Sequence, residues 1–121
     1  IFIIIDYSRN LQNSQGTLSA IKNHRKVNVF NDIGNCDISH NPDFELIKKV
    51  CELNFCKVYG PYTQSLFLQK FGINERFKML INNNPSSEET LLLQKKRLIG
   101  NRYMGNIFKV LVVSDNKCKV I

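Results

Sequence analysis

The pattern of hydrophobic and polar positions along the chain predicts an α/β fold. Short apolar runs at residues 1–5, 55–59 and 107–113 predict strands. The first run consists mostly of β-branched residues without alternation, which is typical of a strand buried on both faces of a parallel sheet. Asp6 and Tyr7 follow this run, at the end of a strand where open α/β sheets place their ligands.

Amphipathic stretches between these runs predict helices. Asn41 and Pro42 predict a helix start, with asparagine as the cap and proline in the first turn. The apolar face of this helix is formed by Phe44, Ile47, Val50 and Cys51, widened by Leu46 and Leu53. Gly60-Pro61 is expected to end the second strand, after which Thr63 caps a second helix that stops at Gly72.

The second half of the chain predicts two further helices. One covers residues 74–81 and is broken by the sequence Asn-Asn-Asn-Pro at 82–85. Ser86 and Glu89 have the spacing of a capping box, which opens a leucine-rich helix that stops at Gly100. The order of strand, insertion, helix, strand, helices and strand matches the second half of a doubly wound sheet.

Residues 8–40 form a long polar insertion without a helical stripe. The pattern leaves open whether Leu18–Arg25 is a strand or a helix. Connections of this length are usually lids or binding segments, so we expect such a role within a single domain, residues 1–121. The chain also opens with Ile1 inside an apolar run, which favours a fragment of a longer protein.

Composition and charge narrow the class of protein. Hydrophobic residues make up 43% and charged residues 22% of the 121 residues, which is typical of a globular domain. The net charge of +7 permits nucleic acid or an acidic lipid surface as a partner. The basic residues are scattered, however, and their one run, 95–97, falls in the last turn of a predicted helix, where cations suit the dipole. Nucleic acid is therefore not the expected partner, and no apolar run approaches the roughly 20 residues that cross a membrane.

The cysteines and histidines do not have the spacing of a metal or redox site. His24 and His40 stand alone in polar sequence. No CxxC pair occurs among the four cysteines, which are Cys36, Cys51, Cys56 and Cys118. Reduced thiols suit the bacterial cytoplasm or the mitochondrial matrix. Gly-rich phosphate loops and nucleophile motifs are also missing, so residue patterns alone lead only to part of an α/β domain.

Four motifs, taken in order along the chain, carry a family resemblance. Ile3–Tyr7, Gly16-Thr17-Leu18 and His24-Arg25 resemble "IDYG … GTLRAYRxHR". Gly34–Ser39 with Asp43-Phe44 resembles "GxADLTxHVDF". Gly60–Gln64, Phe67-Leu68 and Gly72-Ile73 are similar to "GxxTQxxFLxxLGI". Met104-Gly105 with Phe108–Leu111 resembles "MGxLFKVL".

The motifs resemble the MidA family of S-adenosylmethionine-dependent methyltransferases, at near-constant spacing over nearly the whole chain. The resemblance implies a protein arginine methyltransferase of respiratory complex I assembly, with a class I (Rossmann-like) sheet in the complete protein. Residues 1–5 would be a central strand and residues 107–113 the last, antiparallel one, while residues 8–40 would cover the substrate side. The Gly-rich turn and the acidic residue that bind the cofactor would lie upstream of Ile1, so this fragment alone is expected to be inactive.

The chain departs from the family pattern at three polar positions. Ser8 replaces the usual glycine after Asp-Tyr, and Asn28 replaces a usual aspartate. Asn41 occupies the place of a frequent histidine, while His40 stands one position early. These changes keep polarity but lose the charge that proton transfer would use.

Asp6 and Gln64 are the candidate catalytic residues within this resemblance. Methyl transfer is a substitution at the methyl carbon of the cofactor, so the protein must align the nucleophile and tune its charge. Asp6 would hold the substrate nitrogen, and Gln64 would hydrogen-bond across the cleft from a helix start. Tyr7 would pack on the substrate or on the rim of the cofactor.

Thr17, His24, Asp37 and Thr63 are the candidate substrate contacts, the first three from the insertion. Simpler structural roles exist for some candidates. Thr63 suits a helix cap and Asp37 a turn, and Asp6 suits a cap of the neighbouring loop.

Other classes of function stay open. One is a methyltransferase with a different target. Another is a non-catalytic basic module that binds RNA or protein, with strongly salt-dependent binding. A third is a truncated product that neither folds nor acts, because an unpaired apolar sheet edge favours aggregation.

Overall fold

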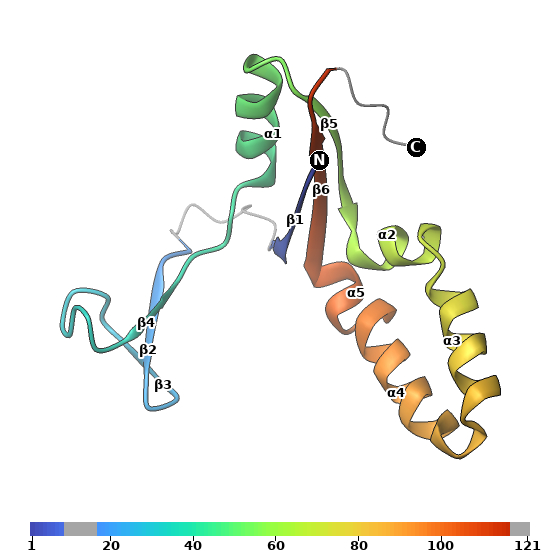
Figure 1. Cartoon of the computed structure of the whole chain (residues 1–121). Coiled ribbons are helices and arrows are strands. Elements are labelled where there is room, and N and C mark those ends of the chain that lie inside the picture. Colours follow the sequence, from blue (N-terminus) through green and yellow to red (C-terminus); the bar gives the residue numbers. More distant parts are fainter. Residues whose placement is uncertain (9–16, 117–121) are drawn as a thin grey trace. The chain divides into compact units, whose positions relative to one another are not determined.

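The computed structural model describes residues 1–8 and 17–116 and divides into two compact units (Figure 1). The core unit comprises residues 1–8 and 43–121, and the insertion unit comprises residues 9–42. Gly16 of the first motif and Cys118 lie outside the described residues. The expected insertion at residues 8–40 therefore corresponds to a structural unit of its own.

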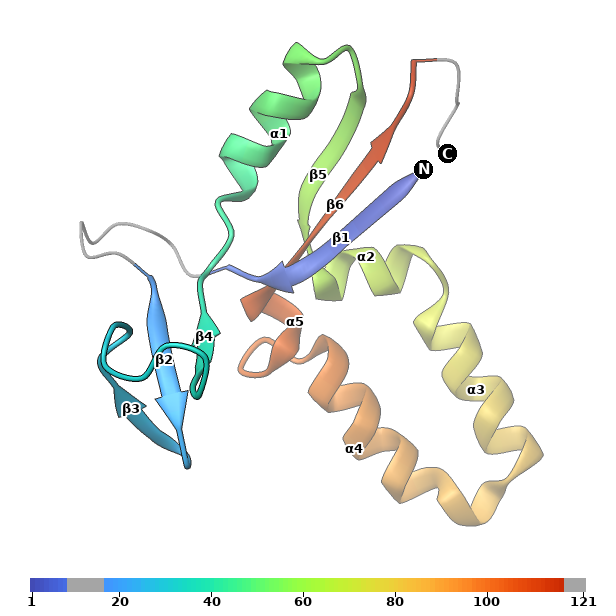
Figure 2. The same ribbon diagram turned by 60° about the vertical axis from the view of Figure 1, so that its left-hand side comes forward.

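The core unit is built on a three-stranded sheet with the order β1-β6-β5. These strands are β1 (Phe2–Tyr7), β5 (Lys57–Thr63) and β6 (Phe108–Ser114), which confirms all three apolar runs as strands. β6 is antiparallel to both neighbours, so β1 and β5 run parallel to each other (Figure 2). Within the described residues β1 is an edge strand, with Phe2 75% and Ile3 55% exposed. Burial on both faces is seen for β6 within the described residues, whereas for β1, as a central strand of the complete protein, it stays a prediction.

Helices cover both faces of this sheet. α1 (Phe44–Leu53) packs on one face, where Phe44, Leu111 and Val113 form the buried cluster. α2 (Gln64–Lys70) contacts β5 and β6 on the other face, to which Val112 points because side chains alternate along a strand. Burial on both faces explains why the sequence of β6 is a continuous apolar run.

The first helix begins at a different cap from the expected one. Asp43 is the N-cap of α1, and its carboxylate accepts a hydrogen bond from the Leu46 amide at 3.0 Å. Asn41 donates its backbone N–H to Thr17 Oγ1 at 3.1 Å within the insertion unit. The prediction of Asn41 as the cap was therefore wrong by two residues, and Pro42 precedes the cap. The apolar face is confirmed for Phe44, Ile47 and Cys51, which contact the core. The other predicted members of the face are exposed: Leu46, Val50 and Leu53.

Gly60-Pro61 does not end the second strand. β5 continues to Thr63 through a bulge between Tyr59 and Tyr62. Gly60 has a φ of 105°, and a Cβ atom there would lie 2.7 Å from the Val110 carbonyl oxygen, so only glycine fits this close approach. The predicted cap at Thr63 is confirmed, since its hydroxyl accepts from the Leu66 amide at 3.2 Å.

Beyond α2 the chain forms a helical hairpin that returns to the sheet (Figure 2). It consists of α3 (Ile73–Asn83), a 3₁₀ turn η1 (Pro85–Ser87), α4 (Glu88–Ile99) and the short α5 (Met104–Ile107). Lys95 Nζ lies 4.5 Å from the centre of the Phe77 ring, a cation–π contact between α3 and α4. The expected capping box is wrong: α4 follows Ser87 without a side-chain cap, and the Ser86 hydroxyl donates to Asn84 Oδ1. The predicted stop at Gly100 is confirmed.

The insertion unit contains a second three-stranded antiparallel sheet with the order β3-β2-β4. Its strands are β2 (Ser19–Lys22), β3 (Arg25–Val27) and β4 (Asp37–Ser39). Asn23 and His24 have φ values of 49° and 60°, as a two-residue type I′ hairpin turn requires. The open question over Leu18–Arg25 is therefore resolved as a β-hairpin.

One ion pair ties the loop after β3 to β2. Lys22 bonds to the Asp32 carboxylate, which also accepts from the Asn35 amide at 3.0 Å. The hydrogen bond from Lys22, helped by the one from Asn35, lowers the pKa of Asp32 below its ordinary value of 3.8. None of the helices in residues 1–8 and 17–116 is long and apolar enough to cross a membrane.

The complete protein should lose stability when the centre of β6 is truncated. Leu111 is fully buried, so Leu111→Ala is expected to lower the free energy of unfolding by about 2–5 kcal/mol, through lost transfer energy and a residual cavity. Leu93→Ala is the matched control, because this side chain is 61% exposed on α4 and should change stability by less than about 0.5 kcal/mol. Urea unfolding measures both, and equal losses would contradict the assignment of the core.

A second stability prediction concerns the tie between α2 and α4. The buried Gln64 donates from Nε2 to the Leu98 carbonyl at 2.8 Å. Gln64→Leu leaves that carbonyl without its donor and is expected to cost about 1–3 kcal/mol. Gln94→Leu, at an exposed position on α4 whose amide has no hydrogen bond among the described residues, should cost less than about 0.5 kcal/mol. Amide hydrogen exchange throughout α2 should also become faster in Gln64→Leu and stay unchanged in the control variant. Equal losses of stability and equal exchange rates in the two variants would contradict the role of the Gln64–Leu98 bond.

Candidate functional site

Polar side chains gather where β1 and β5 reach their carboxyl ends. Because both strands are antiparallel to β6, these ends meet at the same edge of the sheet. The register places Asp6 and Thr63 on either side of Lys109, each directly opposite it. Two strand spacings separate Asp6 from Thr63, about 10 Å across the sheet. Two of the residues selected from the sequence thus lie at one edge, together with Lys109, which the sequence did not single out.

Asp6 is partly buried at this edge, and its carboxylate is held in place locally. Its Oδ1 accepts the backbone N–H of Tyr7 at 2.7 Å. This bond is the local capping role that the sequence allowed as the simpler explanation. Neither Asp6 nor Lys109 has a salt-bridge partner among the described residues, so the carboxylate keeps acceptor positions for a ligand. The ring of Tyr7 stands edge-on to Phe108, with centroids 6.0 Å apart, so packing on a neighbouring strand accounts for its position.

Gln64 and Thr63 have structural partners. The Gln64 amide is buried and donates to the carbonyl of Leu98, and the Thr63 hydroxyl caps α2. A group that already uses its donor to tie two helices is less suited to hold a substrate. A role of Gln64 in catalysis stays a prediction, and the structure supplies a sufficient packing reason for its presence.

The three candidates in the insertion unit occupy separate positions. The Thr17 hydroxyl bonds to the backbone of Asn41, next to the ends of β2 and β4. His24 is exposed at the tip of the β2–β3 hairpin. Asp37 is exposed in β4 opposite Ile21, and so it lies in a strand rather than in the turn that the simpler reading assigned to it. These side chains do not form one cluster within the insertion unit.

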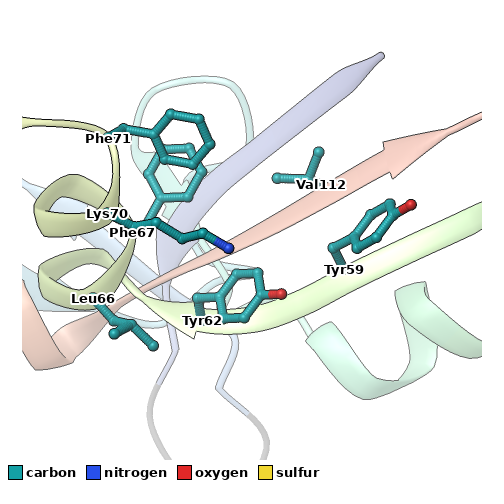
Figure 3. A pocket seen from close by; sticks show the side chains of 7 residues that line it. All are labelled: Tyr59, Tyr62, Leu66, Phe67, Lys70, Phe71 and Val112. Atoms are coloured by element: carbon teal, nitrogen blue, oxygen red, sulfur yellow. The ribbon is translucent and has the colours of Figure 1, made fainter. Parts of the chain in front are cut away.

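A pocket of about 410 Å³ lies on the face of the sheet that carries α2, and sequence reasoning missed it (Figure 3). Its walls come from β5, β6 and α2 and are mostly aromatic. The lining residues are Tyr59, Tyr62, Leu66, Phe67, Lys70, Phe71 and Val112. Phe67 in α2 and Phe71 at its C-cap have a spacing of four residues that was visible in the sequence, but their partners on β5 depend on the bulge.

The described residues provide neither a metal site nor a cofactor loop. No three His, Cys, Asp or Glu side chains gather in residues 1–8 and 17–116. A cofactor loop needs glycines at one strand-to-helix turn, where backbone N–H groups approach the ligand. The glycines with positive φ in this part of the chain are Gly34, Gly60 and Gly72, which lie in the loop between β3 and β4, in β5 and directly before α3, so they do not form such a loop.

Comparisons with known proteins identify relatives of this chain by sequence. The family model described as "Putative S-adenosyl-L-methionine-dependent methyltransferase" matches residues 1–62. The mitochondrial protein arginine methyltransferase NDUFAF7 homolog of Caenorhabditis elegans is 27% identical over 109 residues. The Danio rerio NDUFAF7 protein is 29% identical over 109 residues. In both cases the match covers 88% of this chain and 25% of the relative.

Solved structures share the fold of the chain. Two crystal structures of COG1565 superfamily proteins from Burkholderia thailandensis align with TM-scores of 0.81 and 0.80, at 24% identity. One of them has S-adenosyl-homocysteine bound. Each alignment covers 98% of this chain and 33% of the bacterial protein. The chain thus spans about a quarter of the curated relatives and a third of the solved proteins. Since the family model matches half of its length, the chain belongs to this family of S-adenosyl-L-methionine-dependent methyltransferases, and its resemblance to the MidA family is confirmed.

Proposed function

We propose that this chain is the C-terminal part of a class I (Rossmann-like) methyltransferase that acts on a protein arginine. The observation that carries the proposal is the sheet order β1-β6-β5, in which an antiparallel strand lies between two parallel ones. The parallel strands bring their carboxyl ends, and with them Asp6, to the edge where open α/β sheets bind ligands. The names of the relatives, which are protein arginine methyltransferases, support the reaction and the substrate class.

The two outer strands, β1 and β5, differ in how readily they could pair with a further strand. This difference supports continuation of the sheet beside β1. The outer edge of β5 is interrupted by a bulge and by Pro61, which has no N–H to donate; both features discourage further pairing. β1 has neither device and exposes Phe2, Ile3 and Ile5. An unprotected apolar edge of six residues is suited to another strand, so we place the rest of the methyltransferase sheet, with its cofactor site, beside β1.

Asp6 is the residue of this chain that we assign to the substrate. S-adenosylmethionine, when bound by the complete protein, supplies the methyl group. A guanidinium is a planar cation that a carboxylate binds through charge-assisted hydrogen bonds, often two at once. Asp6, fixed by its bond to the Tyr7 amide, would orient one guanidinium nitrogen and balance its charge. Alignment of the nucleophile is the contribution that a substitution reaction requires from the protein.

The insertion unit is proposed to form the substrate side, with Thr17, His24 and Asp37 as contacts. The substrate would be a protein, with a subunit of respiratory complex I as the expected target. The curated relatives carry mitochondrial names, which supports the mitochondrial matrix, and the bacterial fold relatives support a cytoplasmic counterpart. The alternative of a non-catalytic basic module for RNA or protein has less support, because the family match and the strand order both favour a methyltransferase.

The assignment of Asp6 predicts a loss of turnover in the complete protein. Asp6→Asn removes the negative charge but keeps the acceptor for Tyr7, so methyl transfer to arginine in complex I subunits should fall by about 10- to 100-fold. Binding of S-adenosyl-homocysteine, measured by calorimetry, should stay unchanged. Glu52→Gln is the matched control, because it removes an exposed carboxylate from the last turn of α1, which leads to the amino end of β5. Unchanged turnover in Asp6→Asn would remove this residue from the site.

Continuation of the sheet beside β1 predicts slow amide exchange along the whole strand. An edge strand pairs only every second N–H, whereas an inner strand pairs all of them. In the complete protein every amide from Phe2 to Tyr7 should therefore be protected, as measured by NMR hydrogen exchange. β5 is the internal reference, since one side of it is expected to stay unpaired. Fast exchange at alternate β1 residues would show that β1 is an edge in the complete protein too, and would contradict this arrangement.

A further inference from the structure

The aromatic pocket lies away from the polar edge that the proposed reaction uses. Side chains alternate between the faces of a sheet, so Val110 and Val112 point to the face opposite Leu111, which packs under α1. Tyr59 pairs with Val112 and Tyr62 with Val110, and both therefore face the pocket. A regular strand would turn residues three apart to opposite faces. The extra residue of the bulge brings both phenols to the same side.

The pocket is preformed by interactions that hold α2 in place. The Gln64 amide and the Thr63 hydroxyl fix the start of this helix. The rings of Phe67 and Phe71 pack against each other, with centroids 4.6 Å apart. The wall is nevertheless open, because Leu66 and Phe71 are 56% and 61% exposed. An ordered, mostly aromatic hollow of this volume has the features of a binding site rather than of a packing defect.

Polar groups at the pocket have no partners within the described chain. Lys70 is the only charged lining residue, and in Figure 3 its side chain reaches over Tyr62 into the hollow. In residues 1–8 and 17–116, no carboxylate forms an ion pair with Lys70, and neither phenol of Tyr59 and Tyr62 takes part in a hydrogen bond. One cation and two hydroxyl groups beside an apolar wall are complementary to an apolar group that is followed by a carboxylate.

We propose that this pocket binds a protein segment in which aromatic or aliphatic side chains alternate with Asp or Glu. The side chains of Phe or Leu would fill the hollow between α2 and β5, and a carboxylate would pair with Lys70 and accept from Tyr62. The openness of the wall favours a protein segment over a small ligand, since small ligands are mostly enclosed by their sites.

The test uses the complete protein and a labelled synthetic peptide in which Phe and Leu alternate with Asp and Glu. Its counterpart carries Asn and Gln instead, and fluorescence anisotropy measures both. The acidic peptide is expected to bind about tenfold more tightly, and Lys70→Met should remove that difference while keeping the aliphatic chain. Lys78→Met, a charge removal on α3 outside the pocket, should leave the preference intact. Phe71→Ala should weaken binding of both peptides.

Several results would overturn the proposal. Equal affinity for the two peptides would show that the pocket does not recognise a carboxylate. Equal effects of Lys70→Met and Lys78→Met would leave only nonspecific attraction of charge. Dodecanoate is the small competitor, and saturable binding of dodecanoate without binding of either peptide would identify a small amphiphile as the occupant. Phe71→Cys reports access: if the introduced thiol is blocked from maleimide in the free complete protein, another part of that protein covers the pocket. Because all readouts are binding or labelling, the outcome is independent of whether methyl transfer occurs.

Discussion

The burial of β6 on both faces is the interaction on which the core unit depends. Leu111 and Val113 pack against α1, while Val110 and Val112 lie on the α2 face, and each strand neighbour pairs with β6 over most of its length. Removing these four residues from water supplies most of the hydrophobic stabilisation that so small a sheet can have. β1 and β5 do not contact each other in the ladder, so β6 alone sets their parallel direction and brings their carboxyl ends to one edge. The placement of Asp6 and Thr63 around Lys109 is thus a consequence of the packing of β6.

Elements whose signals are local could be predicted from the sequence. The apolar runs identified all three core strands, and the helix cap at Thr63 and the helix end at Gly100 were also predicted. These predictions succeeded because hydrophobic periodicity and capping depend on residues that are close in sequence. Burial could not be predicted in the same way: the run at residues 1–5 and the run at 107–113 look alike, and only strand order decides which is enclosed. The caps at Asn41 and Ser86 failed for another reason. Several polar residues stand near each helix start, and Asp43 is the cap of α1 because it directly precedes Phe44, the first residue of the helix.

The residues of the candidate site also divide into those that a local sequence signal identifies and those that it does not. Asp6 was placed correctly at a strand end because the apolar run stops there, which is a local signal. Lys109 was not found, since its significance lies in pairing with Asp6 and Thr63, which are far from it in sequence. Gln64 illustrates the opposite case. A motif match singled it out, yet its amide is used to tie α2 to the end of α4, so a matched residue can owe its place in a family motif to packing.

Gly60 and Pro61 affect three features of the structure. These are the outer edge of β5, the aromatic pocket, and the register that places Thr63 opposite Lys109. Both are strand breakers, and the sequence indicated the right residues with the wrong consequence: they distort β5 instead of ending it. The extra residue in the bulge shifts the register, so that Thr63 rather than Tyr62 stands opposite Lys109, and it turns Tyr59 and Tyr62 to the same face. The missing N–H of Pro61 also discourages pairing at the outer edge. The backbone at Gly60 approaches the Val110 carbonyl too closely for any side chain, so a substitution there would disturb the register, the pocket and the protected edge together.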